Sequence, residues 1–245
     1  MSNPYLIPSA VLKVESDNSF LDGYQSNDPT VQSVYFEDFN AMFAGSNGWT
    51  ITETDAAATE AISSGANGLL VITNSSADND IVSMQLGGSS GAALTFLPFE
   101  GRKIWFEVSV SLSDAVESEM AIGLLVTDTD PFSTGPFGGT DGVIFQKVDG
   151  SADVDCYMTN GSAPSGMTTI GTLTSGQFAR LGFVINGIAS VDVYFNRNKI
   201  GTITAELNDG AALRPTISLK NGAAASKVMS IDYIFAAQTR LGVAV

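Results

Sequence analysis

Hydrophobic and polar residues alternate in short runs along this chain, and the alternation predicts strands almost throughout. Across residues 104–112 every second residue is apolar, while the positions between them carry Trp105, Glu107 and two serines. A period of two is typical of a strand with one buried and one solvated face. A second run, residues 120–127, ends at the turn-forming sequence 128–131. We expect these two runs to be long antiparallel strands.

Similar runs recur at short spacing, and Asn-Gly or Asp-Gly pairs, which favour type I′ hairpin turns, follow several of them. Helix signals are few, since only residues 114–120 suit a single helical turn. The pattern predicts an all-β fold, a concanavalin-like jelly-roll β-sandwich of two stacked antiparallel sheets. Its strands are expected at residues 34–39, 49–54, 59–63, 68–73, 81–86, 94–97, 103–112, 120–127, 142–148, 153–159, 167–172, 178–186, 189–196, 199–205, 214–220 and 228–237.

The first part of the chain differs from the rest. An apolar stretch in which Pro4 and Pro8 oppose a regular helix is followed by a polar, turn-rich connector. We therefore expect residues 1–34 to form an extended N-terminal arm and residues 35–245 to form the sandwich domain. The arm either packs as an edge strand on its own sandwich or reaches a neighbouring subunit. In the second case its contacts would come from Tyr5, Leu6, Ile7, Val11 and Leu12.

The amino-acid composition limits the kinds of catalytic and binding site that the protein can contain. The chain has 245 residues, no histidine and a net charge of −15, so histidine-dependent nucleophiles and metal sites are excluded and nucleic-acid binding is not expected. No apolar run is long enough for a transmembrane helix, and the N-terminus lacks the features of a secretory signal peptide. The single Cys156 cannot form an internal disulfide and is expected in the core.

Several short segments together resemble a known family. They resemble structural proteins of tailed bacteriophages that carry a concanavalin-like jelly roll and sit on the virion, often as head decoration proteins. The resemblance covers residues 36–240, implies a virion component without catalysis, supplies no catalytic residues and leaves the arm outside. The segments are residues 102–107, 121–124, 127–129, 141–147, 181–183, 213–215 and 230–234.

Paired carboxylates are the feature to seek in a jelly roll, because some members cleave glycans. That reaction needs two acids roughly 5–10 Å apart, and glycosidases of this fold commonly place Glu-x-Asp-x-x-Glu on one strand. Glu117 and Glu119 lie in the expected turn at 114–120 without the intervening aspartate, and Glu107 has no acidic partner on its own strand. We therefore expect no enzymatic activity, no catalytic residue and no cofactor.

Three Asp-x-Asp clusters, at residues 78–80, 128–130 and 153–155, offer alternating oxygen ligands that suit calcium. None has EF-hand spacing, and such clusters are more often solvated turn residues. If calcium binds at one of them, Asp128 and Asp130 are the favoured ligands, because a glycine-rich loop beside them can supply carbonyl oxygens.

Aromatic residues suggest two surfaces. The candidates for a sugar-stacking platform are Trp49, Trp105, Tyr157 and Tyr194. Trp105 lies on the polar side of its strand, where it either stacks on a sugar or packs beneath a loop or neighbouring strand. The loop at residues 131–140 carries Phe132 and Phe137, which either form an interface or cap one edge of the sandwich.

These features lead to two functional expectations. The first is a bacteriophage capsid decoration protein, made in the host cytoplasm, that binds the major capsid protein on the head exterior and self-associates, with a trimer favoured. Its interface would combine the arm with Phe132 and Phe137. The alternative is a carbohydrate-binding module or phage adhesin that uses the concave sheet face and Trp105. Neither involves nucleic acid or a membrane.

Overall fold

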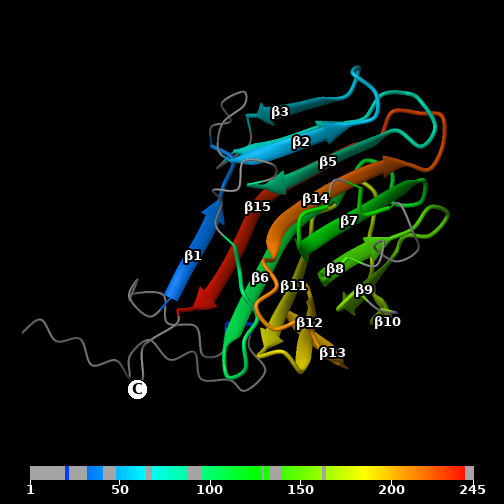
Figure 1. The fold of residues 1–245 in the computed structure, drawn as a ribbon. Helices are drawn as coiled ribbons and strands as arrows, with labels where there is room; N and C mark the ends of the chain where they lie inside the picture. The colour runs from blue at the N-terminus through cyan, green and yellow to red at the C-terminus, as the bar shows by residue number, and fades with distance from the viewer. Residues whose placement is uncertain are drawn as a thin grey trace, which may run out of the picture.

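The computed structural model describes residues 20–21, 32–40, 48–64, 68–87, 95–128, 130–132, 140–161 and 164–240. They form two antiparallel sheets stacked face to face (Figure 1). This confirms the predicted all-β jelly-roll sandwich. No helix in the described part of the chain has the length and apolar character needed to cross a membrane.

One sheet has eight strands. They are β1 (Gln32–Glu37), β3 (Thr59–Ser63), β4 (Leu69–Thr73), β6 (Lys103–Leu112), β11 (Ala179–Asn186), β12 (Ser190–Phe195), β13 (Asn198–Thr204) and β15 (Val228–Thr239). Their order is β13-β12-β11-β6-β15-β4-β3, and β1 pairs with the second half of the long strand β15.

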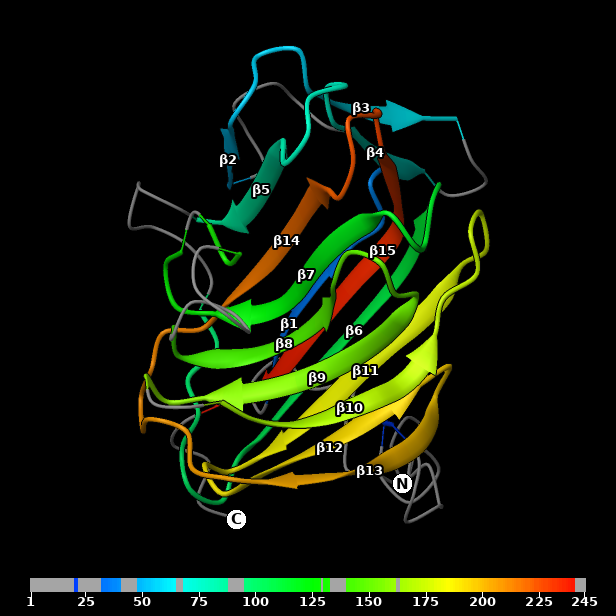
Figure 2. The same cartoon turned by 90° about the vertical axis from the view of Figure 1, so that its right-hand side faces the viewer.

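The other sheet has seven strands. They are β2 (Trp49–Glu53), β5 (Ile81–Leu86), β7 (Ser118–Leu125), β8 (Gly142–Lys147), β9 (Asp153–Thr159), β10 (Ser165–Thr172) and β14 (Arg214–Asn221). Their order is β10-β9-β8-β7-β14-β5-β2. Figure 2 shows this sheet lying against the eight-stranded one.

The main core fills the space between the sheets, because every second residue of each strand points inward. At its centre the rings of Phe106 and Phe183 stack at 4.9 Å, and Phe145 from the opposite sheet lies 5.6 Å from Phe183. Cys156 is fully buried in this core, as predicted. Burial raises the pKa of its thiol, which makes it unreactive.

Two local predictions were wrong. Of the strand expected at residues 94–97, the described residues 95–97 form only a single bridge, between Phe96 and Leu213, and the ladder does not extend along them. The helical turn expected at residues 114–120 does not form, since Ser118 already begins β7. The expected boundary between arm and sandwich at residue 34 falls inside β1.

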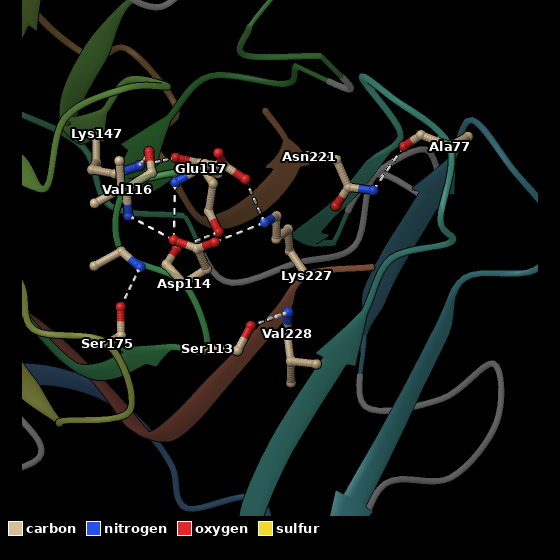
Figure 3. Close-up of polar contacts among 12 residues, drawn as sticks. Ala77, Ser113, Asp114, Val116, Glu117, Lys147, Ser175, Asn221, Lys227 and Val228 are labelled. Atoms are coloured by element: carbon tan, nitrogen blue, oxygen red, sulfur yellow. Dashed lines mark hydrogen bonds and ion pairs between the residues drawn. The ribbon is translucent and has the colours of Figure 1, made fainter. Parts of the chain in front are cut away.

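Two buried lysines hold the turn between β6 and β7 (Figure 3). The Lys227 ammonium donates to Asp114 at 2.8 Å and to Glu117 at 3.3 Å. The hydrogen bond from Lys227, together with the backbone N–H groups of Glu117 and Val116, lowers the pKa of Asp114 to about 2. Lys147 instead donates to backbone carbonyls, including that of Val116 at 2.7 Å. Burial against neutral oxygens lowers the pKa of Lys147 to about 8.

Candidate functional site

A row of small and polar side chains crosses the outer face of the seven-stranded sheet. Gln146 on β8 lies opposite Asp155 on β9 and Ala121 on β7. The row continues through Ser218 on β14 to Ser83 on β5, whose hydroxyls are 2.7 Å apart. Because alternate residues of each strand point inward, these residues all point away from the core. Most of the row is nevertheless buried: Gln146 is 7% exposed and Ala121, Ser218 and Ser83 are at most 2% exposed, whereas Asp155 is half-buried.

Tyr157 stands beside this row on β9. Its hydroxyl donates to Asp155 at 2.9 Å, and the other Asp155 oxygen accepts the backbone N–H of Thr169 at 2.7 Å. Burial, together with the neighbouring carboxylate, raises the pKa of Tyr157 to about 12. Gly166 on β10 lies against the tyrosine ring, where any side chain would collide with it. The ring is therefore fixed at the surface in its neutral, hydrogen-bonding form.

An ion pair lies on the other side of Gln146. Lys220 donates to Glu119 at 2.8 Å, and each side chain is 18% exposed. The Lys220 ammonium also lies 5.9 Å from the centre of the Phe132 ring, within cation–π range. The sequence-based placement of Glu119 in a turn was wrong, because the residue lies on the outer face of β7.

The loop that follows β7 folds over this face. The Gln85 side chain donates to the Val126 carbonyl at 3.0 Å and accepts the Asp128 N–H at 3.1 Å. Phe132 is half-buried and packs on a small apolar cluster of the sheet. In the described structure Phe132 therefore packs on the outer face of the molecule's own sheet and not over an edge of the sandwich. Its expected role at an interface stays a prediction. The cluster comprises Ala121, Leu125 and Ile144.

The favoured calcium ligands, Asp128 and Asp130, accept hydrogen bonds within the same loop. Asp128 accepts hydrogen bonds from the Asp130 N–H at 2.9 Å and the Thr140 hydroxyl at 2.7 Å, and Asp130 accepts the Phe132 N–H at 3.1 Å. Across the described ranges no group of three or more Cys, Asp or Glu side chains could hold a metal ion. The geometry of Asp128 and Asp130 therefore serves loop closure.

On the outer face of the eight-stranded sheet, Trp105 is fully buried. Phe20 covers it, with its ring 5.5 Å from that of Tyr194 and above Gly182, whose lack of a side chain leaves room. The expectation that this side of β6 is solvated was wrong, because a distant aromatic residue covers it. Of the two expected roles of Trp105, the structure shows packing beneath another segment and not an exposed sugar platform. At Phe20 and Leu21, the expected arm packs on its own sandwich.

Glu107 lies two residues along the same strand and is only 2% exposed. Two guanidinium nitrogens of Arg197 donate hydrogen bonds to the Glu107 carboxylate, at 2.8 and 3.1 Å, and the Tyr233 hydroxyl donates to it at 2.6 Å. Arg197 follows Asn196 in the β12–β13 turn, where both residues have positive φ, 49° and 64°. Glu107 thus has no free oxygen for catalysis, and we call this group of three the Glu107 clamp.

The remaining interface residues predicted from the sequence, Phe137 and the five arm residues Tyr5, Leu6, Ile7, Val11 and Leu12, lie outside the described part of the chain. Sequence reasoning named Tyr157 as a candidate sugar-stacking residue, but it missed Gln146 and the Glu119–Lys220 pair. The alternation in β9 already placed Asp155 and Tyr157 on one outer face, so half of this group could have been found.

No family model matches the sequence, and no curated protein matches it. Solved structures do match, among them several at 10–15% identity. The endo-β-1,4-glucuronan lyase of the fungus Trichoderma reesei gives a TM-score of 0.59 over 82% of this chain and 94% of the lyase, at 10% identity. The Emp47p carbohydrate recognition domain gives 0.56 over 85% and 97%, at 13% identity. The Bacillus licheniformis β-glucanase gives 0.54 over 82% and 96%, at 10% identity.

The fold is a concanavalin-like jelly roll. The prediction that the chain is not an enzyme is contradicted by these neighbours, because two of the three are a lyase and a glucanase. The third is a recognition domain, so the jelly roll is shared with non-enzymes. Nothing in the comparisons indicates a phage origin.

Proposed function

We propose that the protein binds a carbohydrate on the outer face of its seven-stranded sheet. The observation that carries this proposal is the arrangement around Gln146, where Tyr157 with Asp155 lies on one side and Lys220 with Glu119 on the other. Carbohydrate recognition needs planar acceptors and donors for hydroxyl groups and a ring for an apolar sugar face. All of these are present here.

The strands supply the precision that such a site requires. Each of these side chains projects from a ladder hydrogen-bonded on both sides, and groups on strands are positioned more accurately than groups on loops. Gln146 can donate and accept at once, which matches a sugar hydroxyl that does the same. The jelly-roll neighbours, a carbohydrate recognition domain, a glucanase and a glucuronan lyase, support the same class of ligand.

Cleavage of the bound sugar has to be tested together with binding. Glu119 and Asp155 lie on β7 and β9, with β8 between them. Neighbouring strands are about 4.8 Å apart, so the two strands are separated by roughly 10 Å. Asp155 is level with Ala121 in the register, and Glu119 lies two residues further along β7, so the two residues are roughly 12 Å apart. That is wider than the separation of about 6.5–9.5 Å found between the carboxyl groups of inverting glycosidases. Each binding assay should also measure new reducing ends and unsaturated products, because the structural neighbours include a glucanase and a lyase.

The experiment is a glycan array followed by calorimetric titration of the best ligand. Gln146→Ala and Asp155→Asn should each weaken binding about tenfold or more, equivalent to about 1.4 kcal/mol. Gln177→Ala, at an exposed site outside the face, is the matched control and should bind like the wild type. Retained thermal unfolding midpoints would show that the variants are folded. A wild-type chain that binds no glycan, or variants that bind unchanged, would refute the proposal.

A second candidate is the capsid decoration role that the sequence resemblance suggests, with a major capsid protein as partner and self-association as a trimer. The observation that favours it is apolar surface on β1, where Val34 is 45% and Phe36 58% exposed. Phe36 lies 5.9 Å from the Tyr233 ring, which extends this surface onto β15. Exposed aromatic residues on an edge strand are suited to contact another protein.

Co-sedimentation with empty capsids and light scattering test this role. Phe36→Ser should reduce both capsid binding and self-association. Ile200→Ser is the control, because that side chain is 42% exposed on another strand. A monomer at all concentrations that does not sediment with capsids would exclude this candidate and leave the glycan proposal intact.

A further inference from the structure

A pocket of about 590 Å³ opens on the outer face of the eight-stranded sheet, next to the Glu107 clamp. It lies on the opposite sheet from the proposed glycan site. Ser109 forms part of its floor and lies opposite Arg180 on β11 and Tyr233 on β15. The β12–β13 turn contributes Asn196 to the same pocket.

Two charged groups in this pocket have no partner among the described residues. The Arg180 side chain is exposed and makes no hydrogen bond or ion pair there, and the half-buried Asp232 carboxylate makes none either. They do not pair with each other. An arginine left free in this way is unusual in a chain with 11 basic residues and 26 acidic ones. The five N–H donors of the Arg180 guanidinium and the carboxylate of Asp232 therefore face one pocket.

Asn196 adds an oriented amide. Its side-chain oxygen accepts the Arg180 backbone N–H at 2.9 Å, which leaves the amide N–H₂ group available to a ligand. The residue is held at a φ of 49°, and Arg197, the next residue, grips Glu107. Non-glycine residues are strained in this conformation and persist where the surroundings fix them. The Glu107 clamp thus orients the pocket wall before any ligand arrives.

Phe178 supplies an apolar surface on the same pocket. Its side chain is 50% exposed, among the highest values for a large hydrophobic residue in the described chain. A phenyl ring at this position can pack against the C–H face of a sugar ring while the polar groups contact its edge.

We infer that this pocket binds a carboxylated sugar residue of the uronic-acid type. The guanidinium of Arg180 would receive the sugar carboxylate, because its planar fork matches that group with two parallel hydrogen bonds. Asp232 would accept hydroxyl hydrogens, Asn196 would donate to a hydroxyl or ring oxygen, and Phe178 would cover the apolar face. The site is independent of the one proposed on the seven-stranded sheet.

Titration of the full-length chain with glucuronate, glucose, acetate and glycine, followed by NMR chemical-shift changes, tests this inference. Glucuronate should bind about tenfold or more tightly than glucose, and its affinity should fall as salt screens the guanidinium. Shifts should centre on Arg180, Asn196 and Asp232. Equal binding of glucuronate and glucose would overturn the inference. So would acetate binding as tightly, which indicates a simple anion site, or tighter binding of glycine, which indicates an amino-acid site.

Substitutions in the pocket test which side chains bind glucuronate. Arg180→Gln should weaken glucuronate binding about tenfold or more, and Phe178→Ser should weaken glucuronate and glucose alike. Lys199→Gln is the matched control, because it removes a positive charge from β13 of the same sheet, outside this pocket. Should Arg180→Gln prove unstable, Asp232→Asn with shift mapping provides the same test. Unchanged glucuronate affinity in a folded Arg180→Gln or Asp232→Asn chain would contradict the assignment.

Discussion

The two outer faces each carry an ion pair of the same length in a different setting. Arg197 and Glu107 are 2.8 Å apart on the eight-stranded sheet, where the Glu107 side chain is 3% exposed and the Arg197 side chain 52% exposed. Lys220 and Glu119 are also 2.8 Å apart on the seven-stranded sheet, but both side chains are 18% exposed. Tyr233 donates a further hydrogen bond to Glu107, so that carboxylate is fully engaged.

Equal distances therefore do not mean equal energies. A buried carboxylate that loses its partner keeps the full cost of desolvation, whereas a partly exposed one regains water. The Glu107 clamp is thus a structural element that holds the β12–β13 turn. The Glu119–Lys220 pair can exchange partners at small cost, which is the property a binding surface needs.

The largest expected effect is the loss of the clamp. Arg197→Met should reduce the free energy of unfolding by about 3 kcal/mol, because it leaves the buried Glu107 carboxylate without its counter-charge and with only the Tyr233 hydroxyl as a partner. Urea denaturation measures this. Lys199→Met breaks a pair at 2.9 Å whose carboxylate, that of Asp192, is 20% exposed, and should cost less than about 1 kcal/mol. Adding Glu107→Gln to Arg197→Met should restore part of the loss. If Arg197→Met lowers the free energy of unfolding as little as Lys199→Met does, the two kinds of ion pair do not differ in energy.

A second prediction concerns the aromatic cover of the eight-stranded sheet. Phe20→Ala should cost about 2 kcal/mol, the value of burying one large apolar side chain, and should expose Trp105 to water. In a Trp49→Phe background only Trp105 emits, so its fluorescence should shift to longer wavelength and become open to acrylamide quenching. Phe178→Ala, at a site that is already exposed, should leave the emission unchanged. If Phe20→Ala does as well, the arm does not cover this face.

How far the sequence predicts the fold is clear from individual strands. The period-two runs and Asn-Gly turns located nearly every strand, because both signals are local in the chain. The run at residues 94–97 failed because a strand also requires a partner ladder, and only one bridge forms there. The prediction that the Trp105 side of β6 is solvated failed for a similar reason. Trp105 is covered by Phe20, and no pattern within β6 can reveal a contact with such a distant residue.

The site was harder to predict because its contacts are long-range. Glu107 is paired with Arg197, 90 residues away, and with Tyr233, 126 residues away. Only the Asp155–Tyr157 contact spans two residues and follows from strand alternation alone. Sequence reasoning could therefore find one half of the outer-face group, whereas the Glu119–Lys220 contact spans 101 residues and needed the sheet order.

A third prediction compares one tyrosine from each face under alkaline conditions. Burial and a neighbouring carboxylate raise the pKa of both Tyr233 and Tyr157 from 10.0 to about 12. The folded state then holds more protons than the unfolded state, so stability should fall as pH rises from 10 to 12. Tyr233→Phe and Tyr157→Phe should each flatten this fall, measured by denaturation between pH 10.5 and 12.

That range avoids the opposite contribution of Lys147. Its pKa is lowered from 10.5 to about 8, so the folded state holds fewer protons and stability should rise between those values. Absorbance of the phenolate provides an independent reading of the two tyrosines. Titration of both at pH 10 in the folded protein would contradict the hydrogen bonds that define the two faces.

The smallest expected effect follows from breaking the partly exposed Glu119–Lys220 pair. Lys220→Met should change the free energy of unfolding by less than about 1 kcal/mol, because Glu119 regains water when its partner is removed. The ammonium of Lys220 also lies 5.9 Å from the Phe132 ring, but methionine keeps the apolar stem against that ring and retains part of the contact. The remaining difference should shrink further in about 1 M salt, where charges are screened beyond about 3 Å, while the cost of Arg197→Met should persist. A Lys220→Met cost equal to that of Arg197→Met, unchanged by salt, would mean that both faces depend on their ion pairs in the same way.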